Sequence, residues 1–306
     1  MCNLCTEMKL NGLHILLTYQ CTSECDHCFV WGSPWQSATL TLSQLRDILR
    51  QAHTQPSIEW IYFEGGEPFL FYPLLLAGVC EAKARGFQIG VVTNAYFAFS
   101  VEDGQQWLKP LAGLVDDFSV SCDLYHSSDP CFHQAASARQ AAEELGMPTS
   151  SISIAQPEVS GAHASFGQLP SDESGVMFRG RAAEKLSARA AHRPWDEFDG
   201  CPHEDLREPG RVHVDPYGEV HICQGISIGN LFQKPLSVIC AEYVPEDHPV
   251  LGPLIQGGPV ELVKFFKLPH AETYADACHL CYQARLNLRA RFPKYLCPDP
   301  MYGIYG

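Results

Sequence analysis

The chain has 306 residues, 46% of them hydrophobic, which suits one large globular domain or two of modest size. Its formal net charge is −14, and 21 scattered Lys and Arg residues stand against 35 acidic ones. This balance argues against nucleic acid as a partner, because a protein that binds phosphates needs clustered basic residues.

The sequence indicates neither a membrane anchor nor a signal peptide. No apolar stretch reaches the roughly 20 residues of a membrane helix, and the first residues lack the basic and apolar regions of a signal peptide. We therefore expect a cytoplasmic protein with no membrane partner. Fourteen cysteines in that reducing compartment indicate metal binding where they cluster, because disulfides are rare there. A secreted disulfide protein is the alternative, but no export signal supports it.

Short β-branched or aromatic runs alternate with helical stretches from residue 11 to about residue 181. This alternation predicts an α/β fold in which crossover helices join parallel strands. The expected strands are His14–Tyr19, Ile58–Phe63, Phe87–Val92, Phe118–Ser121, Ser151–Ala155 and Val176–Phe178. The expected helices are Leu42–His53, Pro73–Arg85, Ser100–Leu111 and His133–Leu145. Six such units are fewer than a closed eight-stranded barrel needs.

The alternation stops near residue 195, where the composition changes. We expect an N-terminal extension at 1–13, the α/β part at 14–195 and a second domain at 196–306. Residues 157–174, rich in Ser, Gly and Pro, are expected to form a loop. Residues 211–223 are expected to form a β-hairpin with a Pro/Gly turn.

Three cysteines, Cys21, Cys25 and Cys28, lie within eight residues directly after the first expected strand. A loop of this kind can wrap its thiolates round one iron–sulfur cube, and three ligands leave one iron open. Short cysteine loops also bind zinc, so the spacing alone leaves the metal undecided.

Further motifs follow the next strands. Gly65, Gly66, Glu67 and Pro68 come after the second strand, and glycines there let a ligand approach the backbone, whose free N–H and C=O groups can bind it. Parallel strands gather ligands at their carboxyl ends, which favours a common site over four separate ordinary turns. The other members are the cysteine loop after the first strand, Thr93 and Asn94 after the third, and Ser119, Ser121, Cys122 and Asp123 at the fourth. Arg179 follows the sixth strand, where an arginine could pair with a ligand carboxylate or only begin a solvated basic helix.

A second set of cysteines lies beyond residue 195. Cys201, Cys223 in a Gly-x4-Cys unit, and the CxxC pair Cys278 and Cys281 come from three segments that are expected to converge on one metal. Spacing allows either a zinc ribbon or a [4Fe–4S] cluster. Cys297 is the rival ligand, and Cys2 and Cys5, near the terminus, receive no role.

Together these motifs resemble those of the radical S-adenosylmethionine (SAM) superfamily, with His27 at the aromatic position of its CxxxCxxC loop. The resemblance implies that GGEP contacts the methionyl amine of SAM, that the turn at Thr93 and the SxD segment bind it, and that Arg179 pairs with its carboxylate. Glu64 departs from the family, which commonly has a small residue there. The second cysteine set resembles the SPASM/Twitch extension with a single auxiliary cluster. The implied fold is a partial (β/α)6 radical SAM barrel followed by a small α+β Twitch-like auxiliary cluster domain.

The resemblance also implies a function. A [4Fe–4S] cluster that binds SAM would generate a 5′-deoxyadenosyl radical, fed by a low-potential donor such as flavodoxin or ferredoxin. We expect the enzyme to oxidise or cyclise a small molecule or a peptide side chain, with one auxiliary [4Fe–4S] cluster. A maturase that modifies peptides or proteins and a non-catalytic two-cluster electron-transfer protein are the alternatives. Asp123 is expected to accept a proton; Cys122 would donate a hydrogen atom or only pack, and packing is favoured.

Overall fold

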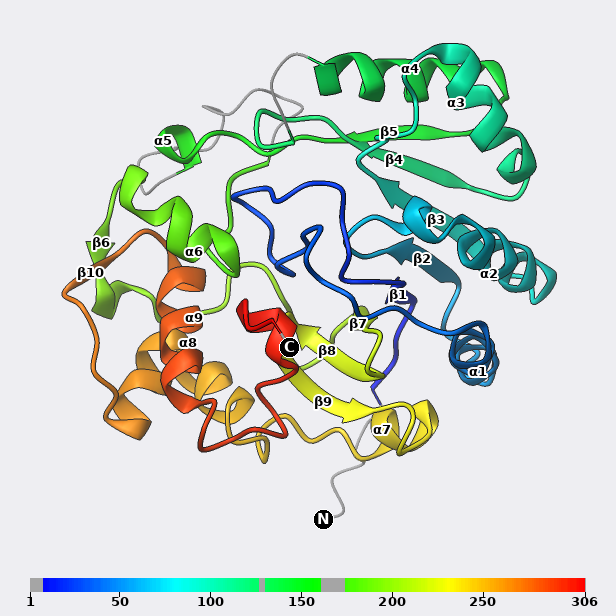
Figure 1. The fold of residues 1–306 in the computed structure, drawn as a ribbon. Helices are drawn as coiled ribbons and strands as arrows, with labels where there is room; N and C mark the ends of the chain where they lie inside the picture. Colours follow the sequence, from blue (N-terminus) through cyan, green and yellow to red (C-terminus); the bar gives the residue numbers. More distant parts are fainter. Residues whose placement is uncertain (1–7, 127–129, 161–173, 306) are drawn as a thin grey trace.

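The computed structural model describes residues 8–126, 130–160 and 174–305. Their main feature is an eight-stranded sheet with the order β5-β4-β3-β2-β1-β7-β8-β9. Figure 1 shows this sheet curving round the segment that follows β1, with α1 to α4 on its outer side. The strands are β1 (Gly12–Leu16), β2 (Trp60–Glu64), β3 (Gln88–Thr93), β4 (Asp117–Ser121), β5 (Thr149–Ile152), β7 (Arg211–Val214), β8 (Glu219–Cys223) and β9 (Ile226–Asn230).

The first five strands run parallel to one another, and each of the four crossovers between them contains one α-helix. These helices are α1 (Leu42–His53), α2 (Tyr72–Ala84), α3 (Val101–Leu108) and α4 (Pro130–Glu144). In α1, Thr41 and Gln44 form a capping box, and residues spaced three or four apart turn to the core. The predicted alternation of strands and helices is therefore present in this part of the chain.

The sixth predicted strand, Val176–Phe178, is wrong. These residues form no strand, because the Phe178 N–H donates to the Asp276 carboxylate and the Arg179 N–H donates to the Met177 carbonyl. The parallel neighbour on the other side of β1 is instead β7, in which His213 stands opposite His14. Because β8 and β9 add to β7 in antiparallel fashion, the sheet continues into the predicted second domain.

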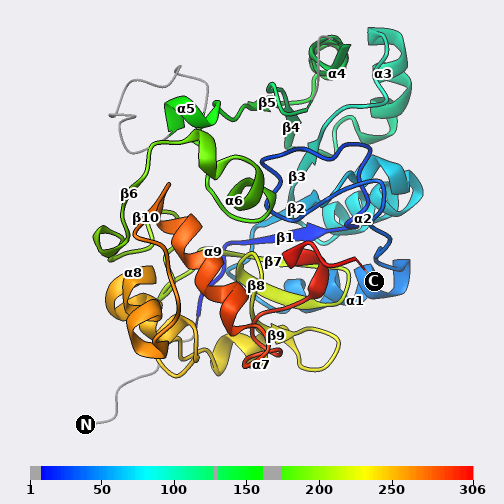
Figure 2. The same cartoon turned by 60° about the vertical axis from the view of Figure 1, so that its left-hand side comes forward.

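The remaining elements lie mainly beside the open side of the sheet (Figures 1 and 2). Apart from short 3-10 helices, they are α5 (Pro157–Ser160), α6 (Arg181–Lys185), α7 (Leu236–Ala241), α8 (Leu251–Phe266), α9 (Ala277–Leu288) and the pair β6 (Arg193–Pro194) and β10 (Thr273–Tyr274). One core fills the space between the sheet and α1 to α4, and a second surrounds α8 and α9. Within the described ranges, no helix is long and apolar enough to cross a membrane. The predicted loop at 157–174 begins with α5, its residues 161–173 lie outside the described residues, and Ser174 forms a bridge with Ile154.

Candidate active site

A cavity of about 280 Å³ lies at the carboxyl ends of the parallel strands. Its wall contains segments from every one of the strand ends β1 to β5, as expected for a parallel α/β sheet. The predicted site residues that line it are Cys21, Cys25, Cys28, Gly65, Gly66, Thr93, Asn94, Ser121 and Arg179. Residues separated by more than 150 positions in the chain thus meet at one site.

The three thiols of the cysteine loop all face this cavity. The N–H of Gly32 donates to Sγ of Cys28 at 3.2 Å, and the Asn94 amide donates to Sγ of Cys21 at 3.5 Å. Burial raises the pKa of the Cys21 thiol to about 12 and that of Cys25 further still. A metal must therefore displace protons, as it does in most thiolate sites. Three soft sulfur donors on one short loop fit an iron–sulfur cluster.

Arg181 holds the loop in place, a role that the sequence analysis did not assign. Its side chain is buried, and its two Nη atoms donate to the carbonyls of Cys25 at 2.8 Å and Gly32 at 3.0 Å. The guanidinium also lies over the Trp31 ring. In the sequence, Arg181 could be noticed only as a second arginine two residues after Arg179, at the start of α6.

The two glycines after β2 pack against the chain that leads into the cysteine loop. A Cβ atom on Gly66 would lie 2.1 Å from the carbonyl oxygen of Gln20, and one on Gly65 would lie 2.5 Å from that of Thr18. The N–H groups of Gly66 and Glu67 donate to these same carbonyls. The expectation of free N–H groups for a ligand is therefore wrong at both residues. Both positions need glycine, because backbone atoms of the segment that leads into the cysteine loop come this close.

Glu67 joins the second and third strand ends. Its buried carboxylate accepts from Thr93 Oγ1 at 2.8 Å, from the Asn94 N–H at 2.8 Å and from the Phe69 N–H at 3.0 Å. Burial raises its pKa to about 7, although these donors act in the opposite direction. The side chain does not line the cavity itself, and it orients the turn whose Asn94 reaches the cysteine loop.

The residues of the fourth strand end separate into three environments. Ser121 lines the cavity, whereas Ser119 lies deeper, hydrogen-bonded to Asp117 and Ser150. Asp123 is buried; its carboxylate lies 2.8 Å from His126 Nδ1 and 3.9 Å from His27 Nε2, and both histidines line the cavity. Burial raises the pKa of Asp123, but His126, His27 and the Tyr125 N–H together lower it by more, so the net shift is downward. Burial lowers the pKa of His27 to about 4.

Cys122 packs against the first core rather than facing the cavity. We expect Cys122→Ala to keep the identity of the product and to reduce activity only modestly, because a partly buried thiol is exchanged for a smaller apolar group. Product analysis by mass spectrometry, beside measurement of 5′-deoxyadenosine, checks this. Normal release of 5′-deoxyadenosine with a lost or altered product would contradict the packing role and assign the thiol to hydrogen donation.

A second cavity contains all four cysteines of the C-terminal set. Cys201, Cys223, Cys278 and Cys281 line it together with two buried arginines, Arg179 and Arg285. Nη1 of Arg179 lies 3.3 Å from Sγ of Cys223 and 3.5 Å from Glu204 Oε1. Four soft donors in one place fit a metal or a cluster.

Arg179 lines both cavities, so the two sites share a wall. Cys297 is not among the residues that line the second cavity; its thiol lies near Glu219 and Asp215 instead. Arg285, one helical turn after Cys281 on α9, was also missed by the sequence analysis. Cys2 and Cys5 lie outside the described residues.

Comparison with known proteins supports the first site. Residues 15–145 match the family model of the radical SAM superfamily. The matched range includes the cysteine loop and the strand ends as far as Asp123. The second cysteine set lies beyond the matched residues. The likeness to this superfamily thus concerns residues 15–145, which are less than half of the chain.

Two curated proteins match a segment of 114 residues. YydG of Bacillus subtilis (strain 168), a protein named for peptide biosynthesis, is 28% identical over 37% of this chain and 36% of its own length. The tungsten-containing aldehyde ferredoxin oxidoreductase cofactor-modifying protein of Pyrococcus furiosus is 32% identical over 37% of this chain and 30% of its own length. The match thus spans about a third of each relative.

A solved structure described as native anSMEcpe with bound AdoMet and the Cp18Cys peptide is similar in fold to most of this chain. It is 11% identical, with a TM-score of 0.52 over 92% of this chain and 97% of that one. At this identity the likeness concerns the fold alone.

Proposed function

We propose that this protein is a radical SAM enzyme that modifies a polypeptide side chain by oxidation, with one auxiliary [4Fe–4S] cluster in residues 196–306. The observation that carries the proposal is the shared wall at Arg179. It separates a three-thiol cavity, bordered by the GGEP, Thr93-Asn94 and Ser121 segments, from a four-thiol cavity. An electron-transfer protein has no need of these strand-end segments, which counts against that alternative.

In this proposal, residues of the first cavity hold a cluster and SAM. Cys21, Cys25 and Cys28 bind three irons of the [4Fe–4S] cluster, and Arg181 keeps their loop in shape. When bound, the reduced cluster and SAM supply a 5′-deoxyadenosyl radical, which takes a hydrogen atom from the substrate. The residues assigned to SAM are Gly65, Gly66, Glu67, Pro68, Thr93, Asn94, Ser119, Ser121 and Arg179. Of these, Glu67, Pro68 and Ser119 lie outside the cavity wall and act indirectly.

The second cavity suits a cluster that accepts an electron. After loss of a hydrogen atom, oxidation of the substrate releases one more electron and one proton. Arg179 and Arg285 are buried positive charges beside the thiols, and such charges favour the reduced form of a cluster. The Asp123–His126 pair borders the first cavity and is our candidate for the proton acceptor. A flavodoxin or ferredoxin would supply the first electron.

A polypeptide substrate is favoured by the name of YydG, which is 28% identical to this chain over 114 residues. A small molecule is the alternative substrate, and the size of the cavity does not exclude it. We place the enzyme in the cytoplasm, because clustered thiols that bind iron need a reducing compartment.

The experiment that tests this proposal compares Cys223→Ala with Cys297→Ala after anaerobic reconstitution. We expect about eight irons per chain in the unchanged protein and in Cys297→Ala, and about four in Cys223→Ala. Cys223→Ala should still release 5′-deoxyadenosine but form no product, because its electron acceptor is lost. Iron is measured by mass spectrometry, and both products by chromatography. Four irons with one zinc in the unchanged protein would contradict the auxiliary cluster.

A further inference from the structure

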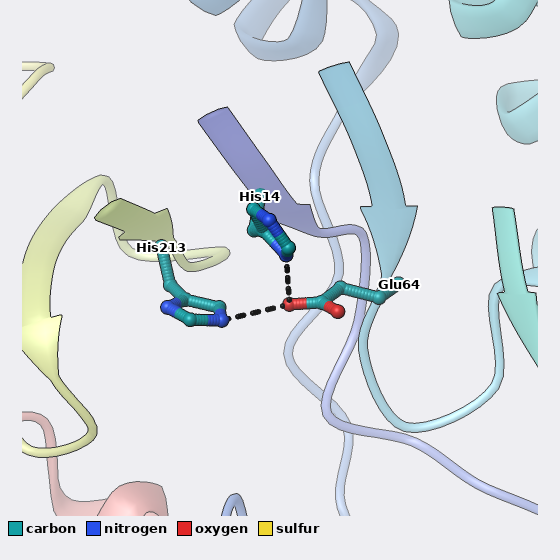
Figure 3. Close-up of side chains that lie close together, drawn as sticks. All are labelled: His14, Glu64 and His213. Carbon is teal, nitrogen blue, oxygen red and sulfur yellow. Dashed lines mark ion pairs between the residues drawn. The ribbon is translucent and has the colours of Figure 1, made fainter. Parts of the chain in front are cut away.

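Three polar side chains from three neighbouring strands converge on the inner face of the sheet. His14 of β1 pairs in register with Tyr62 of β2 and with His213 of β7. Glu64 follows Tyr62 by two residues, so the pleat turns it to the same face. Figure 3 shows both imidazole rings pointing at one carboxylate. Glu64 is the residue that departs from the superfamily motif. It is not among the residues to which we assign the cluster or SAM.

The distances within this group suit metal coordination. Oε1 of Glu64 lies 3.1 Å from Nε2 of His213 and 3.5 Å from Nδ1 of His14 (Figure 3). Ligand atoms bound to zinc at about 2.0–2.1 Å in a tetrahedron lie about 3.4 Å from one another. All three candidate ligand atoms lie within 4.8 Å of one another. The two separations measured from Glu64 therefore lie just below and just above the distance between two ligand atoms of a tetrahedral zinc site.

Glu64 lies within ion-pair distance of both imidazoles, and these lower its pKa although burial raises it. Oε1 of Glu64 and Nδ1 of His14 are buried, yet within the described part of the chain neither has a hydrogen-bond partner of acceptable geometry. Buried polar atoms normally have such partners, because an unsatisfied one costs about 1–3 kcal/mol. The neighbouring His27–Asp123–His126 group differs, since its carboxylate accepts from the Tyr125 N–H and lies in hydrogen-bond contact with His126.

The surroundings hold both imidazoles in position. The Tyr62 ring stacks on His14 with centroids 4.7 Å apart, and Phe29 meets the edge of His213. Tyr62 can lie flat there because Gly90 stands opposite it; a Cβ atom on Gly90 would come within 2.2 Å of the ring. Packing that fixes ring orientation is what a preorganised metal site requires.

We propose that His14, Glu64 and His213 bind a single zinc-type divalent ion, separate from both iron–sulfur sites. Two imidazoles and a carboxylate are ligands that zinc accepts, and three protein ligands leave its fourth position open. Glu64 also lines the 280 Å³ cavity, so the ion borders the space assigned to SAM and the substrate. Its chemical role there is that of a Lewis acid toward a carbonyl, hydroxyl or carboxylate oxygen of the substrate.

The test uses the reconstituted two-cluster protein exposed to zinc chloride and then freed of excess metal. Mass spectrometry should find about one zinc per chain, and X-ray absorption at the zinc edge should show only N/O ligands at about 2.0–2.1 Å. Glu64→Gln and His14→Ala should lose the zinc while the iron count stays unchanged. The exposed histidine in His270→Ala is the matched control and should keep both metals.

A ligand exchange covers the case in which a truncated variant fails to fold. In His213→Cys the zinc should remain and one sulfur should appear in its shell at about 2.3 Å. Zinc surrounded by sulfur in the unchanged protein would show that it occupies the cysteine sites, and zinc retained by Glu64→Gln and His14→Ala would show that it lies elsewhere. Either result overturns the proposal. Iron content and 5′-deoxyadenosine report separately on the radical SAM function, so the two hypotheses fail independently.

Discussion

Replacing Cys25 with Ala is expected to abolish reductive cleavage of SAM. Its buried thiol faces the same cavity as Cys21 and Cys28, and two remaining thiols cannot hold a cube with one open iron. The yield of 5′-deoxyadenosine should fall to the level of the assay without enzyme, and the iron content should drop from about eight to about four per chain.

The matched control is Cys80→Ala, which removes an exposed thiol from α2. It should leave both the iron content and the 5′-deoxyadenosine yield unchanged. If Cys25→Ala cleaves SAM at the rate of the unchanged protein, the radical SAM assignment of the first cavity must be abandoned.

The second large effect is expected for Gly66→Ala. The added Cβ atom would lie 2.1 Å from the Gln20 carbonyl oxygen and 2.7 Å from that of Tyr19, and these backbone atoms cannot rotate away. The free energy of unfolding should fall by about 1–3 kcal/mol or more. Because Gln20 directly precedes Cys21, the cysteine loop should also shift and bind iron poorly. Denaturant unfolding and iron analysis measure the two consequences.

Gly12→Ala serves as the control for this substitution. The glycine lies on β1 of the same sheet, and a Cβ atom there would meet only Arg211 at 3.7 Å and Trp60 at 3.9 Å, which are ordinary contacts. Its stability should change by less than about 0.5 kcal/mol. An equal free energy of unfolding for the two variants would mean that the close approach of Gly66 to the Gln20 carbonyl does not affect stability.

Much of the fold was predictable from short stretches of sequence. The helix Leu42–His53 has the predicted bounds, because its capping residues and its apolar spacing are both local signals. The first five strands were placed to within a few residues for the same reason. The strand at Val176–Phe178 was wrong, because a run of three apolar residues does not reveal that Asp276 takes its backbone N–H.

The candidate site was predictable in composition but less so in arrangement. The cysteines, the glycines and the strand-end motif residues were recognised from their spacing, which depends on neighbours in the chain. The reason for Gly66 was not recognised, because its close neighbour is Gln20 on another segment. Arg181 was overlooked for a similar reason, since nothing near it in sequence shows that it donates to the carbonyls of Cys25 and Gly32.

The sequence by itself determined the first five strands and the helices between them, and which residue types supply sulfur, carboxylate and imidazole ligands. It could do so because hydrophobic period, capping and loop spacing act over a few residues. Only the tertiary structure decided which of them meet. The parallel pairing of β1 with β7 brings His213 beside His14 and Glu64, and the path after residue 178 puts Arg179 between the two cavities. Such meetings depend on strand register and on packing between segments distant in the chain, whose free energy is settled only when the whole sheet and its cores assemble.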